Sequence, residues 1–325
     1  MTTLPVTIAE EIFQEHKPFL WSLCYRLTGS TADADDLVQE TFTRALEHPP
    51  VRTDAPWRPW LVRVAMNLGR DLLRRRKRRT YIGPWLPSPL ETSPAMEVTL
   101  STVEEESPPS YEPADGQSST EGRYDLLESV SFAFLLALEA LSPQQRAVLL
   151  LRDVFDYSVQ ETAEALGISE ANVKTSYHRA RRALQAYDRD RCIPTRTLQQ
   201  RTRQALERFL TCLINQDVAT IEALLTADIR AVSDGGGEFL AALRPVVGRD
   251  KVVRFYLKTN QRRGSSARSD IRMINGLPAL VIEFTDNAPR EVSRMVMCCD
   301  LAPDGRIKTL YSILASRKLT AVRFA

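Results

Sequence analysis

Residues 158–184 constrain the fold of this chain most strongly, because they predict two short helices joined by a tight turn. Ser158 to Glu161 have the pattern of a capping box, which satisfies free backbone N–H groups at a helix start. Gly167 suits the reversal between the helices, and Ser169 can cap the second one. A helix-turn-helix is therefore expected, with an ordinary helical hairpin as the alternative.

Helical spacing divides the second helix of this pair into two faces. Val173, Tyr177 and Leu184 are expected to face inward. The outward face combines residue types that read base edges with types that bind phosphate, as a helix in a DNA major groove requires. The outward residues are Glu170, Asn172, Lys174, Thr175, Ser176, His178, Arg179, Arg181 and Arg182. The alternative for this face is a solvated basic surface.

A second basic element runs from Arg70 to Arg79, where seven basic residues outnumber Asp71 and give a net charge of +6. Apolar residues at helical spacing lead into it. Trp57 and Trp60 precede it, and aromatic rings beside arginines suit single-stranded nucleic acid. The alternatives are a solvated tail and, above all for Trp60, a place in the core.

The rest of the chain divides by composition. Residues 8–79 show helical periodicity, with Gly29 ending one helix and Ser30 starting the next. Residues 85–123 hold six prolines, and Glu91 to Glu121 carry eight acidic residues and no basic one, which is typical of an extended or disordered linker.

The last third has a different period. It begins with a helix over 198–215, and strands are expected at 271–273, 280–284, 292–297 and 307–313. A helix followed by antiparallel strands indicates an α+β domain.

Composition excludes several classes of protein. No apolar run approaches the ~20 residues of a membrane span, and the N-terminus has no secretory signal pattern. The five cysteines are scattered, as expected for reduced thiols in the cytoplasm. No histidine lies beyond His178, which disfavours histidine-based catalysis or metal binding in the last third.

Three motifs in this order resemble the extracytoplasmic-function (ECF) group of bacterial RNA polymerase sigma factors. The similar segments are Asp33 to Phe42, Trp60 to Arg75, and Leu141 to Leu184. The resemblance implies two all-α sigma domains, region 2 at 1–80 and region 4 at 126–192, joined by an acidic linker at 81–125. It further implies that a base flipped from the −10 element enters a pocket at about Thr53 to Arg58.

Residue roles follow from the same resemblance. The polymerase-binding residues would be Asp33, Asp35, Asp36, Gln39 and Glu40. Those holding the melted −10 strand would be Trp57, Arg58, Arg63, Asn67, Arg70, Arg74 and Arg75. Those binding the −35 duplex would be Glu170, Asn172, Lys174, Ser176, Arg179 and Arg181.

Residues 196–325 resemble SnoaL-like domains of the NTF2-like cone fold, which a subgroup of these sigma factors carries as a fused regulatory extension. The segment Asp234-Gly235-Gly236-Gly237 is part of this resemblance. The subgroup's linker motif is present as Trp85-Leu86-Pro87, with Ser88 in place of its usual acidic residue, and Trp85 is expected to anchor in the SnoaL-like domain, with a loosely exposed residue as the alternative. Asp234 could accept hydrogen bonds from the linker, although a plain turn is the alternative. The C-terminal motif of the subgroup is reduced here to Lys318 and Leu319.

The sequence thus predicts a cytoplasmic, non-enzymatic sigma factor whose C-terminal domain modulates it in cis. Its expected partners are the clamp helices and flap of core RNA polymerase, promoter DNA and, within the chain, the SnoaL-like domain against the sigma domains and linker. No cofactor, metal or membrane is expected. Two alternatives remain: a helix-turn-helix regulator with a ligand-binding NTF2-like domain, and an NTF2-like enzyme fused to a DNA-binding domain.

Overall fold

The computed structural model describes residues 6–50, 56–78, 81–92, 124, 126–263, 266–284 and 292–324. Most of the expected acidic linker, Arg79 and part of the expected base pocket lie outside these residues. The chain divides into two compact units. The first comprises Met1–Arg79, Pro94–Val130 and Phe134–Cys192, and the second comprises Thr80–Ser93, Ser131–Ala133 and Ile193–Ala325.

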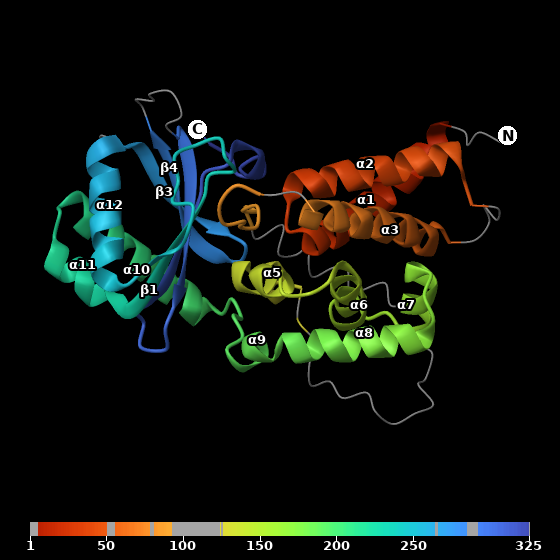
Figure 1. Ribbon diagram of the computed structural model, residues 1–325. Coiled ribbons are helices and arrows are strands. Elements are labelled where there is room, and N and C mark those ends of the chain that lie inside the picture. The colour runs from red at the N-terminus through yellow and green to blue at the C-terminus, as the bar shows by residue number, and fades with distance from the viewer. Residues whose placement is uncertain are drawn as a thin grey trace. The chain divides into compact units, whose positions relative to one another are not determined.

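The described part of the first unit is helical (Figure 1). Its elements are α1 (Val6–Thr28), α2 (Thr31–Glu47), α3 (Trp57–Arg78), η2 (Glu128–Val130), most of α5 (Phe132–Leu138), α6 (Pro143–Asp153), α7 (Val159–Leu166), α8 (Glu170–Ala183) and α9 (Gln185–Arg189). Apolar side chains of α1 and α3, among them Leu20, Leu23 and Leu61, are completely buried. Their removal from water stabilises the packing of these helices.

Local hydrogen bonds explain the helix-turn-helix of α7 and α8. Ser158 and Glu161 form a complete capping box at the start of α7. Gly167 ends α7 in the left-handed region at φ 62°, which glycine adopts without a Cβ clash. The Ser169 hydroxyl then accepts from the Asn172 backbone N–H at 3.3 Å and caps α8. The predicted helix-turn-helix is confirmed.

The second unit has the expected α+β architecture. Its elements are α10 (Arg196–Ile214), α11 (Val218–Leu224), β1 (Leu225–Asp234), β2 (Val246–Val247), α12 (Arg249–Arg263), β3 (Ser266–Ile274), β4 (Leu277–Phe284), β5 (Arg294–Leu301), β6 (Ile307–Ile313) and η3 (Ser316–Lys318). The six-stranded sheet has the order β2-β1-β6-β5-β4-β3. Helices α10, α11 and α12 lie on one side of this sheet (Figure 1).

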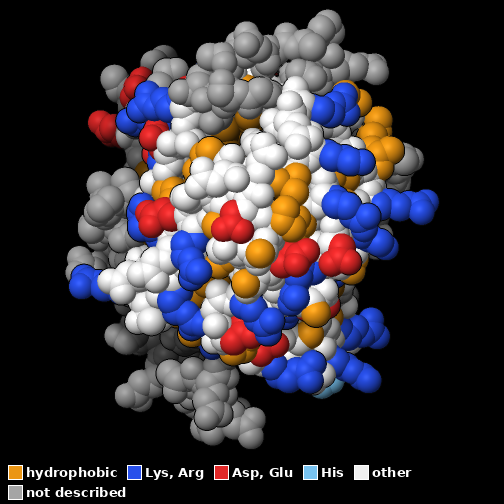
Figure 2. Space-filling model, turned by 90° about the vertical axis from the view of Figure 1, so that its left-hand side faces the viewer, with side chains coloured by type: hydrophobic (Ala, Val, Ile, Leu, Met, Phe, Trp, Pro, Cys, Tyr) orange, Lys and Arg blue, Asp and Glu red, His pale blue; other side chains and the backbone are white. Residues whose placement is uncertain are grey.

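The core of the second unit lies between those helices and the sheet. Leu206, Leu225, Val252 and Leu310 are at most 1% exposed within it. The face of the molecule shown in Figure 2 carries Lys and Arg side chains together with Asp and Glu side chains and scattered hydrophobic ones. Helix α10 is amphipathic, because its buried residues Leu206 and Phe209 belong to this core whereas Glu207 is exposed.

Two features of the second unit differ from the expectation. β1 pairs with β6 in parallel, so the sheet is mixed and not purely antiparallel. β1 and α12 were not expected from the sequence. The burial of β1 does not alternate regularly, and its pairing shifts register between Leu225 and Arg230, which weakens the period-2 signal of a strand.

None of the helices that the structure describes combines the length and apolar character that a membrane span requires.

Candidate polymerase and nucleic-acid interfaces

The expected polymerase-binding residues lie on one side of α2. Asp35, Asp36, Gln39 and Glu40 are exposed, and Asp33 is half-buried. They face outward because the intervening apolar residues of α2 pack inward. The resulting acidic surface suits a basic docking partner.

Two of these carboxylates are oriented by neighbouring side chains. The Trp21 Nε1–H donates to Asp35 Oδ1 at 2.7 Å, and Arg44 Nε donates to Glu40 Oε1 at 2.8 Å one helical turn away. Asp33 pairs with Arg76 of α3 at 3.6 Å. Asp36 and Gln39 are also exposed and belong to the same side of α2.

Helix α3 presents most of the expected −10 residues on its surface. The rings of Trp57 and Trp60 meet edge to face at 6.2 Å and are both half-buried, so Trp60 is not a fully buried core residue. The Arg58 guanidinium lies 3.9 Å from the centre of the Phe19 ring. The exposed arginines of this set are Arg63, Arg74 and Arg75.

Arg70 differs from its neighbours because it is buried, with 8% of its surface exposed. Its guanidinium donates to the Leu166 carbonyl of α7 at 3.0 Å and to the Asn67 side chain. Burial, with a smaller contribution from Arg74, lowers the pKa of Arg70. In this arrangement Arg70 connects α3 to the helix-turn-helix, and the Asn67 side-chain oxygen accepts from the same guanidinium.

Helix α8 exposes Glu170, Asn172, Lys174 and Arg179, as expected. The expected outward position of Ser176 is wrong. Ser176 is buried because α8 packs on α6, and its hydroxyl accepts from Gln144 Nε2 at 2.9 Å.

The inward side of α8 is held by a polar cluster. Val173 and Leu184 are buried and Tyr177 is half-buried, in line with the expectation. The Tyr177 hydroxyl donates to Asp153 at 2.7 Å. Arg181, which was expected on the outward face, is instead half-buried and donates to the same carboxylate at 3.2 Å. Burial and this hydrogen bond raise the pKa of Tyr177 to about 12. Burial raises the pKa of Asp153, while Tyr177 and Arg181 oppose that rise.

In the second unit, residues 81–92, here called the tether segment, pack on the α+β domain. The Asp234 carboxylate is completely buried and accepts from the Tyr81 hydroxyl at 2.6 Å and the Leu86 N–H at 2.8 Å. It also accepts from the Gly236 N–H at 3.1 Å. Asp234 therefore accepts hydrogen bonds from this part of the linker, as expected.

A buried lysine completes the same site. Lys318 Nζ pairs with Asp234 Oδ2 at 2.6 Å and also donates to the Leu86 carbonyl. Its ammonium lies 4.3 Å from the centre of the Trp85 ring and 5.0 Å from that of Tyr81. Cation–π attraction adds to the ion pair here, because the aromatic faces are negative. Leu86 and Pro87 are buried, and Trp85 is half-buried.

The glycines after Asp234 permit close packing around it. Gly236 and Gly237 have φ values of 59° and 78°, which favour glycine. A Cβ on Gly237 would lie 2.9 Å from Ile82 of the tether segment, and one on Gly236 would lie 2.9 Å from Ala315. A Cβ on Gly235 would lie 2.9 Å from the Phe239 carbonyl.

The far end of the tether segment is held by the β3–β4 turn. The Leu90 N–H donates to Asn275 Oδ1 at 2.9 Å, and the Asn275 N–H donates back to the Leu90 carbonyl at 2.8 Å. The Thr92 N–H donates to the Met273 carbonyl at 2.9 Å. These bonds fix the backbone of the segment at both ends.

Sequence reasoning missed Tyr81 and Asn275 as partners of this contact, and assigned no role to Lys318. The Asn275-Gly276 pair is a turn signal, and Lys318 is the charged residue kept in the reduced C-terminal motif. Among the described residues, no cluster of three His, Cys, Asp or Glu could hold a metal ion.

Comparison with known proteins places these elements in a family. The model of Sigma-70 region 2 matches residues 12–79, and that of Sigma-70 region 4 matches residues 131–184. The ECF RNA polymerase sigma factor SigJ of Mycobacterium tuberculosis is 31% identical over 320 residues, which are 95% of this chain and 92% of SigJ. SigG of the same organism is 41% identical over 165 residues, half of this chain and 44% of SigG.

The crystal structure of Mycobacterium tuberculosis SigJ also matches, with a TM-score of 0.68 and 28% identity. The match covers 95% of this chain and 97% of that one, and so includes the C-terminal α+β unit as well as the helical regions. Because SigJ is 31% identical over 95% of this chain and both sigma-70 regions match, the chain belongs to the ECF family of RNA polymerase sigma factors.

Proposed function

We propose that this chain directs promoter-specific initiation by RNA polymerase and that its C-terminal unit modulates this activity in cis. Its family membership and its two sigma-70 regions support the first part. The observation that carries the second is the buried Asp234–Lys318 pair, which holds the tether segment on the C-terminal unit. This role requires no catalysis and is exercised in the cytoplasm, where RNA polymerase acts.

The acidic side of α2 is proposed to bind the clamp helices of the largest polymerase subunit, and region 4 the flap. Electrostatic complementarity of this kind favours docking and partner choice. The exposed carboxylates of Asp36 and Glu40 are suited to this role because they already face solvent.

The surfaces of α3 and α8 are proposed to hold the −10 strand and the −35 duplex. In the first unit the buried Arg70 joins α3 to the helix-turn-helix through the Leu166 carbonyl. We propose that this compact arrangement is inactive, since Arg70 and Asn67 are engaged within the protein. Core polymerase would favour an open arrangement by binding it more tightly, which shifts the population.

Run-off transcription with core polymerase tests the first part. Glu40→Lys should reduce both core binding and initiation, because it places a cation on the acidic docking surface. Glu207→Lys is the matched control, as it reverses another exposed helical glutamate, on α10. Wild-type core binding by Glu40→Lys together with wild-type initiation would contradict the polymerase-binding role.

The same assay tests modulation in cis. Asp234→Asn removes the charge that pairs with Lys318 and should release the tether segment. We expect a higher initiation rate with core binding retained, since the C-terminal unit is proposed to maintain the inactive arrangement. An unchanged rate would count against modulation through this contact.

A conventional helix-turn-helix regulator is not favoured, because both sigma-70 regions match and the SigJ similarity spans nearly the whole chain. Such a regulator would bind duplex DNA without polymerase. Gel shifts with and without core therefore separate the two functions.

A further inference from the structure

The second unit contains a cavity of about 380 Å³ between its helices and its sheet. Residues of α10, α12, β4, β5 and β6 line it, and Ile214 and Leu240 at its rim are 59% and 60% exposed. This volume lies within the range of small-molecule sites, ~300–1,000 Å³. The exposed rim residues give a ligand a route from solvent.

The lining of this cavity selects for an apolar molecule. Leu213, Phe255, Ile282, Met295 and Met297 supply apolar wall, and methionines adapt to irregular shapes. No Asp, Glu or His is among the described residues that line it, whereas Arg262 is. A cationic ligand would find no counter-charge in this lining, while a neutral or acidic polar end would be tolerated.

A few polar groups lie on the sheet side of the cavity. The hydroxyls of Tyr256 and Ser312 lie 3.2 Å apart, and Ser312 is the register partner of Ser233 on β1. Both serines line the cavity. Convergent hydroxyls in an otherwise apolar pocket can orient one polar group of a ligand.

This polar side is directly connected to the residues that hold the tether segment. Asp234 follows Ser233 in β1, and its backbone carbonyl accepts from the N–H groups of Leu314 and Ala315, at 2.8 and 3.2 Å. Leu314 itself lines the cavity, and the chain continues from it to Lys318. A ligand that moves Ser233 or Leu314 therefore acts on segments that carry both partners of the Asp234–Lys318 pair.

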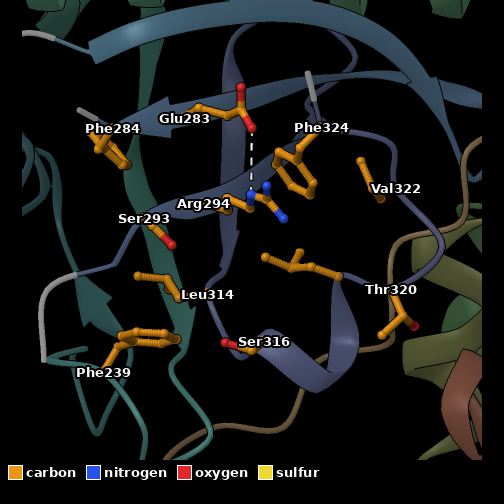
Figure 3. Close-up of a pocket in the computed structure, with 11 residues that line it drawn as sticks. Phe239, Glu283, Phe284, Ser293, Arg294, Leu314, Ser316, Thr320, Val322 and Phe324 are labelled. Carbon is orange, nitrogen blue, oxygen red and sulfur yellow. Dashed lines mark ion pairs between the residues drawn. The ribbon is translucent and has the colours of Figure 1, made fainter. Parts of the chain in front are cut away.

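A second hollow, of about 600 Å³, lies beside the C-terminal residues (Figure 3). It shares Leu314 and Phe284 with the cavity and extends to Phe324, whose ring lies 4.9 Å from the Arg294 guanidinium. This hollow separates part of the C-terminal residues from β4 and β5, although Leu319 and Val322 are buried.

We propose that the cavity is a binding site for a small apolar molecule with a neutral or acidic polar end. Ligand binding there changes how tightly the tether segment is bound to the rest of the second unit. This coupling between the ligand and the tether segment rests on the proposed modulation in cis. Ligand binding can shift such an equilibrium only by its difference in affinity for the two states.

Binding is tested with full-length protein and the apolar dye Nile red, followed by fluorescence. Saturable binding should be displaced by 1-decanol and decanoate, and much less by decylamine. Met297→Phe inside the cavity and Ile214→Trp at its rim should each weaken the dye by about tenfold or more. Val218→Trp is the matched control, because Val218 is exposed but does not line the cavity. Absence of saturable binding, unchanged dye affinity in folded Met297→Phe and Ile214→Trp, or preferred displacement by decylamine would overturn the proposed site.

Coupling is tested by hydrogen exchange of residues 86–92 with and without saturating 1-decanol. We expect the exchange rate to change by about fivefold or more, because the Leu86 and Leu90 amides are bonded to Asp234 and Asn275. Bound ligand without any change would overturn the coupling. The Asp234→Asn transcription assay uses no ligand, so it decides modulation in cis separately from this proposal.

Discussion

Replacing Asp234 by Asn should loosen the tether segment in a measurable way. The substitution keeps the shape of the side chain but leaves the buried Lys318 ammonium without its counter-charge. Breaking a buried ion pair by removing one partner costs about 3–5 kcal/mol. Lys318 retains the Leu86 carbonyl and the faces of Trp85 and Tyr81, and cation–π contacts are worth about 0.5–2 kcal/mol. Because these contacts continue to stabilise the ammonium, the loss is expected toward the lower side of that range, at about 2–4 kcal/mol.

Hydrogen exchange at the Leu86 amide measures this loss locally, because that N–H donates to Asp234. A loss of about 2–4 kcal/mol corresponds to exchange roughly 30- to 700-fold faster, as about 1.4 kcal/mol is tenfold in an equilibrium constant. Asp304→Asn makes the same chemical change at an exposed Asp–Arg pair and should leave this amide unaffected. Acceleration below about threefold would refute the reasoning, because it is what a solvated surface pair produces.

Three further changes test other parts of the chain. Gly167→Ala forces a Cβ into φ 62° and should lower the free energy of unfolding of the first unit by about 1–2 kcal/mol in urea; an unchanged midpoint would contradict the turn. Arg70→Met removes the donor to the Leu166 carbonyl and should lower the local stability of α7 by about 1–3 kcal/mol, which speeds its amide hydrogen exchange. Wild-type exchange rates in α7 would contradict the α3–α7 contact. Burial raises the pKa of the Cys24 thiol to about 12. Iodoacetamide at pH 8 should therefore modify the half-buried Cys192 first, as followed by mass spectrometry. Early labelling of Cys24 would contradict its burial.

Helix starts and turns could be predicted because their causes are local. The Ser158 hydroxyl meets a backbone N–H three residues along the chain, and Gly167 adopts a φ that few other residues tolerate. The outward residues of α2 were predictable for a similar reason, since helical periodicity sets which side chains share a face.

The sheet was less predictable because its pairing joins distant segments. β1 lies against β6 in parallel although helix α12 and four strands intervene in the chain. No short-range pattern encodes such a partner, and the register shift in β1 blurs the alternation that does mark a strand.

The sequence alone predicted the helix-turn-helix and the family resemblance, and it offered Asp234 as a possible acceptor for the linker beside the alternative of a plain turn. Only the tertiary structure decided that Arg70 and Ser176 are buried and that Lys318 pairs with Asp234. The physical reason is the distance along the chain over which each kind of interaction acts. Caps, turns and helical faces depend on neighbours within a few residues, whereas burial and ion pairing depend on which distant segments pack together.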